Sequence, residues 1–255
     1  MYKKQEIFMV QTDKAYKLLA LQEGISNRAA KDLIDRGVVY AAGKKVLVAR
    51  ADMKAGTTFK VNKLKKPTVI FEDDKIVAVD KPPFLTAEEI SESFELTLLH
   101  RLDKETSGVL LLSKDEEFTK KVIAAFRAGK VKKAYLAIVG GKLIEPQRID
   151  TPLKITKTKS GAYAKVAKDG QAAITLVEPK LVEGKNSLVE VSIETGKTHQ
   201  IRAHLKSIGF SVLGDEKYGG KTAPRIMLHA WKIELLGYSF ESPPPSEFAN
   251  FGKNS

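Results

Sequence analysis

The chain of 255 residues contains no cysteine, only four histidines and a single tryptophan. Without cysteine, disulfides, thiolate nucleophiles and cysteine-based metal sites are excluded, and four histidines are few for a structural zinc. No apolar run is long enough to span a bilayer, and residues 1–6 lack the apolar stretch of a signal peptide. We therefore expect a cytoplasmic protein that uses no metal and no membrane.

Positive charge is concentrated at the start of the chain. The net charge is +12, and residues 1–66 hold 15 Lys and Arg against 6 Asp and Glu, which is +9 of that total. Such a density of cations is expected of a module that neutralises nucleic-acid phosphates. A basic surface that serves only solubility is the alternative interpretation.

The basic segment has its own pattern of secondary structure. Apolar spacing and capping residues predict two helices, with Ser26 or Asn27 capping the second, and short β-prone runs come next with a turn at 41–44. The expected helices cover residues 15–22 and 28–35, and the expected strands cover residues 38–40, 46–48 and 58–61.

Composition then suggests three parts. Residues 62–67 are cationic and end in proline, as expected of a linker. We expect a small module at 1–66, a main domain at 67–245 and a polar, disordered tail at 246–255. The chain as a whole is 43% hydrophobic, which is ample material for a core.

The most informative string is HRLDKETSGVLLLSK at residues 100–114. It places one carboxylate, Asp103, between a basic residue and a Thr-Ser-Gly turn, directly before a predicted strand at 109–112. A bare Arg-Leu-Asp most often caps a turn, so the weight lies on the length of the string and on the motifs later in the chain. Ser113 or Asp115 is then expected to cap a helix that runs to Phe126.

Three further strings come after it in order. KKAYLAIVG at 132–140 alternates as a strand, in which a tyrosine is usually a half-buried core residue. In TGKTHQIRAHL at 195–205, Thr198 is expected to cap a helix. His199 and His204 lie five residues apart, so they face different sides of that helix and do not make a metal site. GDEKYG at 214–219 and RIMLHAW at 225–231 complete the set, and further strands are expected at 162–166, 172–177 and 187–193.

Together with FEDDKIVAVDKPP at 71–83, these strings resemble the RluA-type RNA pseudouridine synthases over residues 68–245. The chain departs from that family at residues 84–89, which are expected to form a short loop with altered substrate contacts. The N-terminal string GISNRAAKDLIDRGV at 24–38 resembles, in part, the alpha-L RNA-binding module of ribosomal protein S4.

The resemblance implies an α+β fold. Its catalytic domain would be a curved, mostly antiparallel mixed sheet with flanking helices, joined to a small N-terminal αβ RNA-binding module. It also implies a monomer that isomerises specific uridines of structured RNA to pseudouridine by base flipping, without a cofactor. Ribosomal RNA is favoured over transfer RNA, and RNA is the only partner implied.

The family's roles carry over to matching positions. Asp103 would be the nucleophile or electrostatic stabiliser, compatible with attack on the base, attack on the sugar or a glycal route. Arg202 would pair with Asp103, and Tyr135 would lie against the target base. Arg101 would fill the space that the uridine leaves, and Leu228 would form an apolar wall. The other expected RNA contacts are His100, Lys197, His199, Arg28, Lys31, Lys44 and Lys45.

Two other functions remain open. An aspartate-based glycosidase or hydrolase would need a second carboxylate near Asp103, where the string supplies basic residues instead. A noncatalytic RNA-binding or ribosome-assembly protein that retains the fold is the other alternative.

Overall fold

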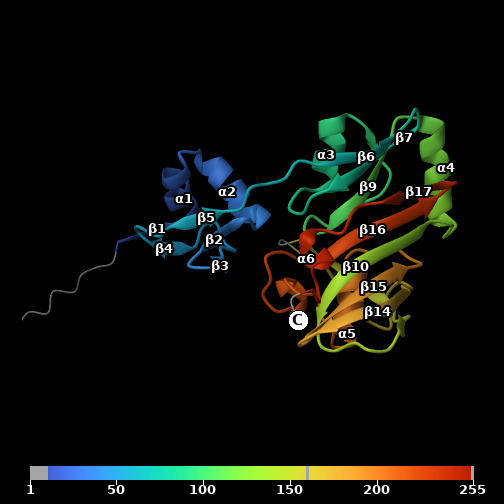
Figure 1. Cartoon of the computed structure of the whole chain (residues 1–255). Coiled ribbons are helices and arrows are strands. Elements are labelled where there is room, and N and C mark those ends of the chain that lie inside the picture. The colour runs from blue at the N-terminus through green and yellow to red at the C-terminus, as the bar shows by residue number, and fades with distance from the viewer. Residues whose placement is uncertain (1–10, 159–160, 254–255) are drawn as a thin grey trace, which may run out of the picture. The chain divides into compact units, whose positions relative to one another are not determined.

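The computed structural model describes residues 11–158 and 161–253, and the chain divides between Lys65 and Lys66 into two compact units. Each unit has its own helices and strands (Figure 1).

The N-terminal unit is a small αβ module. Helix α2 begins where the Ser26 hydroxyl accepts a hydrogen bond from the Ala29 backbone N–H at 3.1 Å, as expected, and Gly24 and Gly37 end the two helices in the left-handed conformation. In chain order its elements are β1 (Thr12–Lys14), α1 (Ala15–Glu23), α2 (Asn27–Arg36), β2 (Val39–Ala41), β3 (Lys44–Lys45), β4 (Asp52–Lys54) and β5 (Phe59–Val61).

The strand expected at 46–48 is wrong in this unit. The Val46 N–H still bonds to the Val39 carbonyl at 2.9 Å, but the chain then turns, with the Ala51 N–H bonded to the Val48 carbonyl. Leu47 and Val48 are exposed as a result. Strands β1 and β4, which pair with each other, were not expected from the sequence.

The C-terminal unit is built on a mixed, mostly antiparallel sheet. Within the described residues it has ten strands in the order β11-β14-β15-β10-β16-β9-β7-β6, with β17 on β16 and β8 on β9; the pair β9–β16 is parallel. This is the α+β architecture expected from the sequence. The strands are β6 (Thr68–Glu72), β7 (Ile76–Lys81), β8 (Thr97–Leu98), β9 (Ser107–Ser113), β10 (Lys132–Gly140), β11 (Gln147–Ile149), β14 (Thr175–Glu183), β15 (Asn186–Ile193), β16 (Leu228–Leu235) and β17 (Tyr238–Glu241).

Helices flank this sheet on both faces. Val77, Val79, Leu110 and Leu112 face one cluster, which includes residues of α3 and α5, whereas their neighbours in sequence face a second cluster with α4. Strands β7 and β9 are thus buried on both sides, which explains their unbroken apolar runs. The helices are α3 (Ala87–Phe94), α4 (Glu116–Arg127), α5 (Gln200–Ser207), the 3-10 helix η1 (Glu216–Tyr218) and α6 (Ser246–Ala249).

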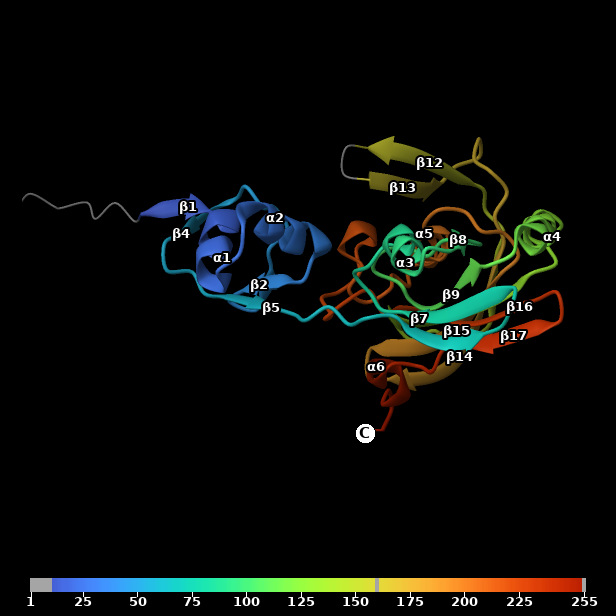
Figure 2. The same ribbon diagram turned by 90° about the horizontal axis from the view of Figure 1, so that it is seen from above.

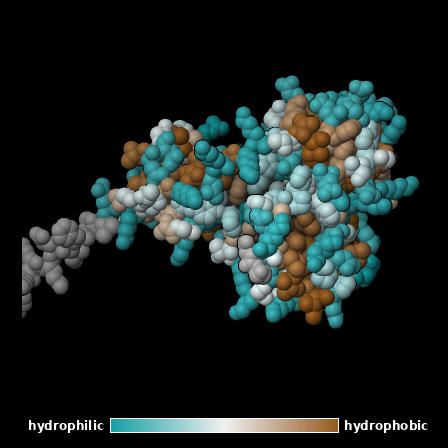
Figure 3. Space-filling view, viewed as in Figure 1, coloured by the Kyte–Doolittle hydropathy of each residue, from teal (hydrophilic) through white to brown (hydrophobic). Residues whose placement is uncertain are grey.

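A separate hairpin, β12 (Leu153–Thr158) with β13 (Gly161–Val166), stands off the large sheet (Figure 2). It packs on α5 and η1 through a small cluster that contains Ala164, Ala203 and Tyr218. On the face of the C-terminal unit drawn in Figure 3, hydrophilic side chains cover most of the surface and hydrophobic ones form smaller patches.

Three expectations for this unit are corrected. Residues 87–94, expected within a short loop path, form α3, because Thr86 and Glu89 make a reciprocal capping box. The polar tail is ordered where it is described: α6 buries Phe248, and Glu247 pairs with Arg225 at 3.2 Å. The remainder of the expected tail, residues 254–255, lies outside the described residues. The strand expected at 172–177 begins at Thr175 and continues to Glu183 through a bulge.

Candidate active site

Asp103 lies on the loop that enters β9. The turn expected at Thr-Ser-Gly lies instead at Lys104 and Glu105, because Ser107 and Gly108 already belong to β9 and pair with β16. The Thr106 N–H bonds to the Asp103 carbonyl at 3.0 Å and closes the turn. Gly108 has φ +117°, and a Cβ there would lie 2.1 Å from the Ala230 carbonyl oxygen. Only glycine permits this approach, so the string places Asp103 at the junction of the two parallel strands.

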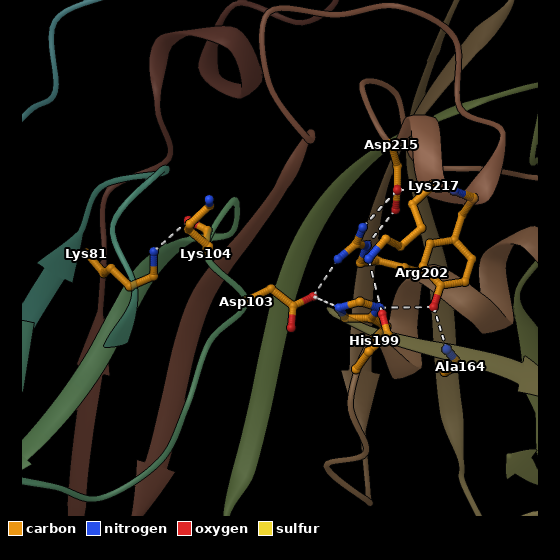
Figure 4. Close-up of polar contacts among 10 residues, drawn as sticks. Lys81, Asp103, Lys104, Ala164, His199, Arg202, Asp215 and Lys217 are labelled. Atoms are coloured by element: carbon orange, nitrogen blue, oxygen red, sulfur yellow. Dashed lines mark hydrogen bonds and ion pairs between the residues drawn. The ribbon is translucent and has the colours of Figure 1, made fainter. Parts of the chain in front are cut away.

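Arg202, on α5, is held between two carboxylates (Figure 4). Its Nη1 donates to Asp103 Oδ2 at 2.9 Å, while Nε and Nη2 donate to the two Asp215 oxygens at 2.6 and 2.9 Å. Arg202 and Asp215 are buried, whereas Asp103 keeps 24% side-chain exposure. Burial alone would lower the pKa of Arg202, but its carboxylate partners outweigh that effect and raise it. Arg202 is therefore a permanent cation, and its hydrogen bond holds the partly exposed Asp103 carboxylate in place.

His199 stands beside this pair. Its Nε2 lies 3.8 Å from Asp103 Oδ2, and its Nδ1 lies 3.0 Å from the Tyr218 hydroxyl. Burial lowers the pKa of His199, so the imidazole is neutral at pH 7. Tyr218 packs edge-on against the His199 ring and lies under the Arg202 guanidinium.

An open cavity of about 740 Å³ contains these groups, a size within the range of roughly 300–1,000 Å³ that is usual for ligand sites. Tyr135 and Leu228, both buried, belong to its lining. Burial, reinforced by the charge of Asp103, raises the pKa of Tyr135, so its phenol keeps its proton. Cations outnumber anions in the lining, which includes Arg101, Lys104, Lys133, Lys157, Lys197, Arg202 and Lys217 beside Glu88, Asp103 and Glu105.

Arg101 lies at the mouth of the cavity. Its side chain is 76% exposed, and its Nε pairs with Glu88 of α3 at 2.8 Å. Helix α3, which the sequence did not predict, therefore places a carboxylate beside the residue expected to enter the RNA stack.

His100 and Lys81 support the loop from beneath. His100 Nε2 accepts the Leu111 N–H at 3.3 Å, and burial lowers its pKa to about 4. His100 thus has a structural contact with β9, and the RNA contact expected from the sequence stays a prediction. The Lys81 ammonium is fully buried and donates to the carbonyls of Pro82, Leu85 and Lys104, which ties the residue after Asp103 to β7.

The basic residues singled out in the N-terminal unit are at or near its surface. Arg28 on α2 and Lys44 at the β2–β3 turn are exposed. Lys45 is half-buried, and the Lys31 ammonium lies 4.2 Å from the centre of the Tyr16 ring. Lys31 thus has a cation–π contact within its own unit.

The predicted cap of α5 is wrong. His199, not Thr198, precedes the helix, with φ 53° and no side-chain capping bond. The buried Gln200 side chain is the reason, because its oxygen accepts hydrogen bonds from the Lys197 N–H and the Thr195 hydroxyl and holds the turn below the helix.

Sequence reasoning missed the roles of Asp215 and Tyr218. Both belong to the string at 214–219, but no spacing rule connects them with a helix that begins fifteen or more residues earlier. The signal in the sequence was an aspartate directly after a glycine. In the structure a Cβ at Gly214 would lie 1.9 Å from the Arg225 carbonyl oxygen, so this position requires glycine.

Among the described residues, no cluster of histidine and acidic side chains could hold a metal ion. In the same part of the chain, no helix is long and apolar enough to cross a membrane.

The mostly antiparallel mixed sheet that carries this Asp–Arg pair has the pseudouridine synthase fold. The RNA pseudouridylate synthase family model matches residues 59–207. The chain belongs to this family and is an RNA pseudouridine synthase.

Named relatives agree with this assignment. The chain is 49% identical to an uncharacterized RNA pseudouridine synthase of Helicobacter pylori strain J99, over 92% of this chain and 99% of that one. It is 31% identical to ribosomal large subunit pseudouridine synthase D of Nitrosomonas europaea, over 71% of this chain and 63% of that one. Human RNA pseudouridylate synthase domain containing 1 shares the fold, with a TM-score of 0.62 and 22% identity over 75% of this chain and 88% of that one.

Proposed function

We propose that this enzyme converts specific uridines of structured ribosomal RNA to pseudouridine, with Asp103 as the catalytic carboxylate. The observation that carries the proposal is the 2.9 Å contact between Arg202 and Asp103 in a cavity whose lysines and arginines outnumber its carboxylates. A carboxylate hydrogen-bonded to a buried arginine is held in one orientation, and the surrounding cations suit a polyanionic substrate.

The reaction is an isomerisation, so its atoms balance without a second substrate. The bond between uracil N1 and the ribose breaks, the base turns, carbon 5 bonds to the ribose, the carbon 5 proton leaves and N1 gains a proton. The charge of Asp103 would act on the base or the sugar as the first bond breaks. Tyr135 and Leu228 would hold the flipped base, since a phenol ring stacks on a pyrimidine and an isobutyl group excludes water.

Arg101 would enter the RNA stack that the uridine leaves. Unstacking a base costs a few kcal/mol, and a guanidinium offsets part of that by stacking on the neighbouring bases. Its 76% exposure at the cavity mouth supports this role, because the side chain can reach a duplex without rearrangement of the core.

We further propose that the N-terminal unit is an S4-like RNA-binding module. Its support is the charge of +9 on residues 1–66, the exposed Arg28 and the lysines at the β2–β3 turn. Such a module captures RNA through phosphates and leaves the chemistry to the C-terminal unit.

Ribosomal RNA is favoured because the relative from Nitrosomonas europaea is named for the large ribosomal subunit. Pseudouridines in ribosomal and transfer RNA should be mapped by chemical derivatisation in a strain that lacks the gene, and again after complementation. We expect one or more ribosomal sites to disappear, to return with the wild-type gene and to stay absent with Asp103→Asn. Loss confined to transfer RNA would contradict the substrate, and restoration by Asp103→Asn would contradict the mechanism.

A further inference from the structure

A chain of polar contacts runs from hairpin β12–β13 to the catalytic carboxylate (Figure 4). The Ala164 N–H donates to the Tyr218 hydroxyl oxygen at 2.8 Å, that hydroxyl lies 3.0 Å from His199 Nδ1, and His199 Nε2 lies 3.8 Å from Asp103 Oδ2. These groups come from β13, η1, the turn before α5 and the loop before β9.

The contacts determine which ring nitrogen of His199 carries the proton. The Tyr218 hydroxyl already accepts the Ala164 N–H, so its own hydrogen is free to bond to Nδ1. The opposite tautomer would give that oxygen two donors and leave its hydrogen in a residue that is 1% exposed. It would also turn the Nε2 lone pair toward the Asp103 carboxylate. Both arguments favour the Nε2–H tautomer, whose proton faces Asp103.

The backbone at His199 is held in an uncommon conformation. With φ 53° and ψ 22°, a non-glycine residue occupies the left-handed region at a helix start, where an extended residue with a capping side chain is usual. Strain of this kind persists where the surrounding packing fixes it, and it is concentrated at functional sites. Here it directs a ring that is only 11% exposed toward Asp103.

We propose that His199 is a positioning residue for Asp103, held by Tyr218 as the neutral Nε2–H tautomer. Arg202 already bonds to Oδ2 at 2.9 Å, and the His199 Nε2–H approaches the same oxygen from 3.8 Å. That distance is too long for a hydrogen bond in the free enzyme. It closes when RNA is bound, as contacts of catalytic groups commonly do. The inference rests on the proposed role of Asp103.

Burial, more than any neighbouring charge, lowers the pKa of His199. The carboxylates act in the opposite sense, and the nearby cations add to the lowering. The titratable and charged groups that face it are Asp103, Arg202, Asp215, Lys217 and Tyr218.

The tautomer can be measured directly by nitrogen NMR of protein labelled in its histidine rings. The chain has four histidines, so the His199 signals are those missing from His199→Gln. We expect a protonated Nε2 and an unprotonated Nδ1 at pH 7. Tyr218→Phe keeps the ring packing but removes the hydroxyl, so it should mix the tautomers and raise the pKa of His199. A protonated Nδ1 in the wild type, or no change in Tyr218→Phe, would overturn the inference.

Kinetics supply the second arm. His199→Met removes the donor, whereas His199→Gln, of similar size and with the same backbone strain, places an amide N–H near the position of Nε2. Single-turnover rates at saturating RNA should fall at least tenfold for Met and recover in part for Gln, whereas the dissociation constant for RNA should change much less than the rate. Lys206→Gln, on an exposed residue of the same helix, is the control and should keep the wild-type rate.

Equal losses for Met and Gln, or a wild-type rate for Met, would refute the positioning role. This failure is distinguishable from failure of the proposed function. An active Asp103→Asn enzyme would remove the catalytic role of Asp103, whereas the tautomer measurement does not depend on activity.

Discussion

Arg202 shows how one buried side chain organises the site. It bonds to Asp215, which is fully buried, and to Asp103, which is partly open to the cavity. The buried Asp215 carboxylate fixes the orientation of the Arg202 guanidinium, and the guanidinium in turn orients the Asp103 carboxylate. Because a buried ion pair is costly to break, Asp215 should matter for stability as well as for catalysis.

Replacing Asp215 by Asn should therefore lower the free energy of unfolding by roughly 3 kcal/mol, because it leaves a buried guanidinium short of a charged partner. Urea denaturation measures the change. Asp169→Asn is the control, since Asp169 pairs with Lys154 on the surface and its loss should cost much less stability. Equal effects of the two substitutions would contradict the role given to Asp215.

His100, the first residue of the string at 100–114, should make the stability of the fold depend on pH. Burial lowers its pKa to about 4, below the usual value of about 6.5. Between these values the unfolded chain binds a proton that the folded chain does not, so stability falls as the pH drops through that window and is level above it.

From pH 7 to pH 5, His100 should thus cost about 2 kcal/mol of unfolding free energy. His100→Gln retains an acceptor for the Leu111 N–H and should remove that part of the acid sensitivity. The measurement is urea denaturation of both proteins at the two pH values. Identical pH dependence in the variant and the wild type would show that His100 is not the titrating group.

The residues of the site were predictable to different degrees. Four residues singled out from the sequence line the same cavity: Asp103, Arg202, Tyr135 and Leu228. They could be singled out because each lies in a long string that matches a family pattern. The contacts of Asp215 and Tyr218 were not predictable, since they depend on how a loop folds back over α5. The tautomer of His199 is even less predictable from the sequence, because it depends on the hydrogen bonds that Tyr218 makes with His199 and Ala164.

At the scale of elements, helix α3 is the main feature that sequence reasoning missed. Its apolar content is low and it is eight residues long, so periodicity gave little signal. The signal present was the pair Thr86 and Glu89: the Thr86 hydroxyl accepts the Glu89 N–H at 3.1 Å and Glu89 accepts the Thr86 N–H at 2.7 Å. By contrast, β9 was predicted well, because a strand that is buried on both faces leaves an unbroken apolar run in the sequence.

Thr86→Ala should lower the stability of α3 by about 1 kcal/mol, the usual cost of losing an N-cap side chain. Hydrogen exchange of the amides in residues 87–94 would detect the faster local opening. Glu92→Ala, an exposed change in the same helix, should shift the exchange by less than about 0.5 kcal/mol. Similar exchange in the two variants would mean that the capping box does not hold the helix.

At the scale of the whole molecule, charge and chemistry are divided between the two units. Every residue that lines the cavity around Asp103 belongs to the C-terminal unit, whereas most of the excess positive charge belongs to residues 1–66. The charge distribution was visible in the sequence. The order of the ten strands in the large sheet was not, because strand pairing joins segments far apart in the chain.

If the N-terminal unit captures RNA, Lys44→Gln with Lys45→Gln should weaken RNA binding and flatten its salt dependence. Removing one cation from a phosphate lowers the slope of log affinity against log salt by roughly 0.7 to 0.9. The matched control is Lys120→Gln with Lys121→Gln on α4, which packs on the sheet face opposite α3. Dissociation constants at several salt concentrations test this, and equal slopes for the two double variants would contradict the assignment.

The central claim is that the Asp103 carboxylate drives the isomerisation, and release of tritium from RNA labelled at carbon 5 of uridine tests it most directly. That hydrogen leaves only when carbon 5 bonds to the ribose. Purified wild-type enzyme should release it, and Asp103→Asn, checked for deamidation, should release none above background while binding the RNA within a few-fold of the wild-type affinity. Measurable tritium release by Asp103→Asn would contradict the claim.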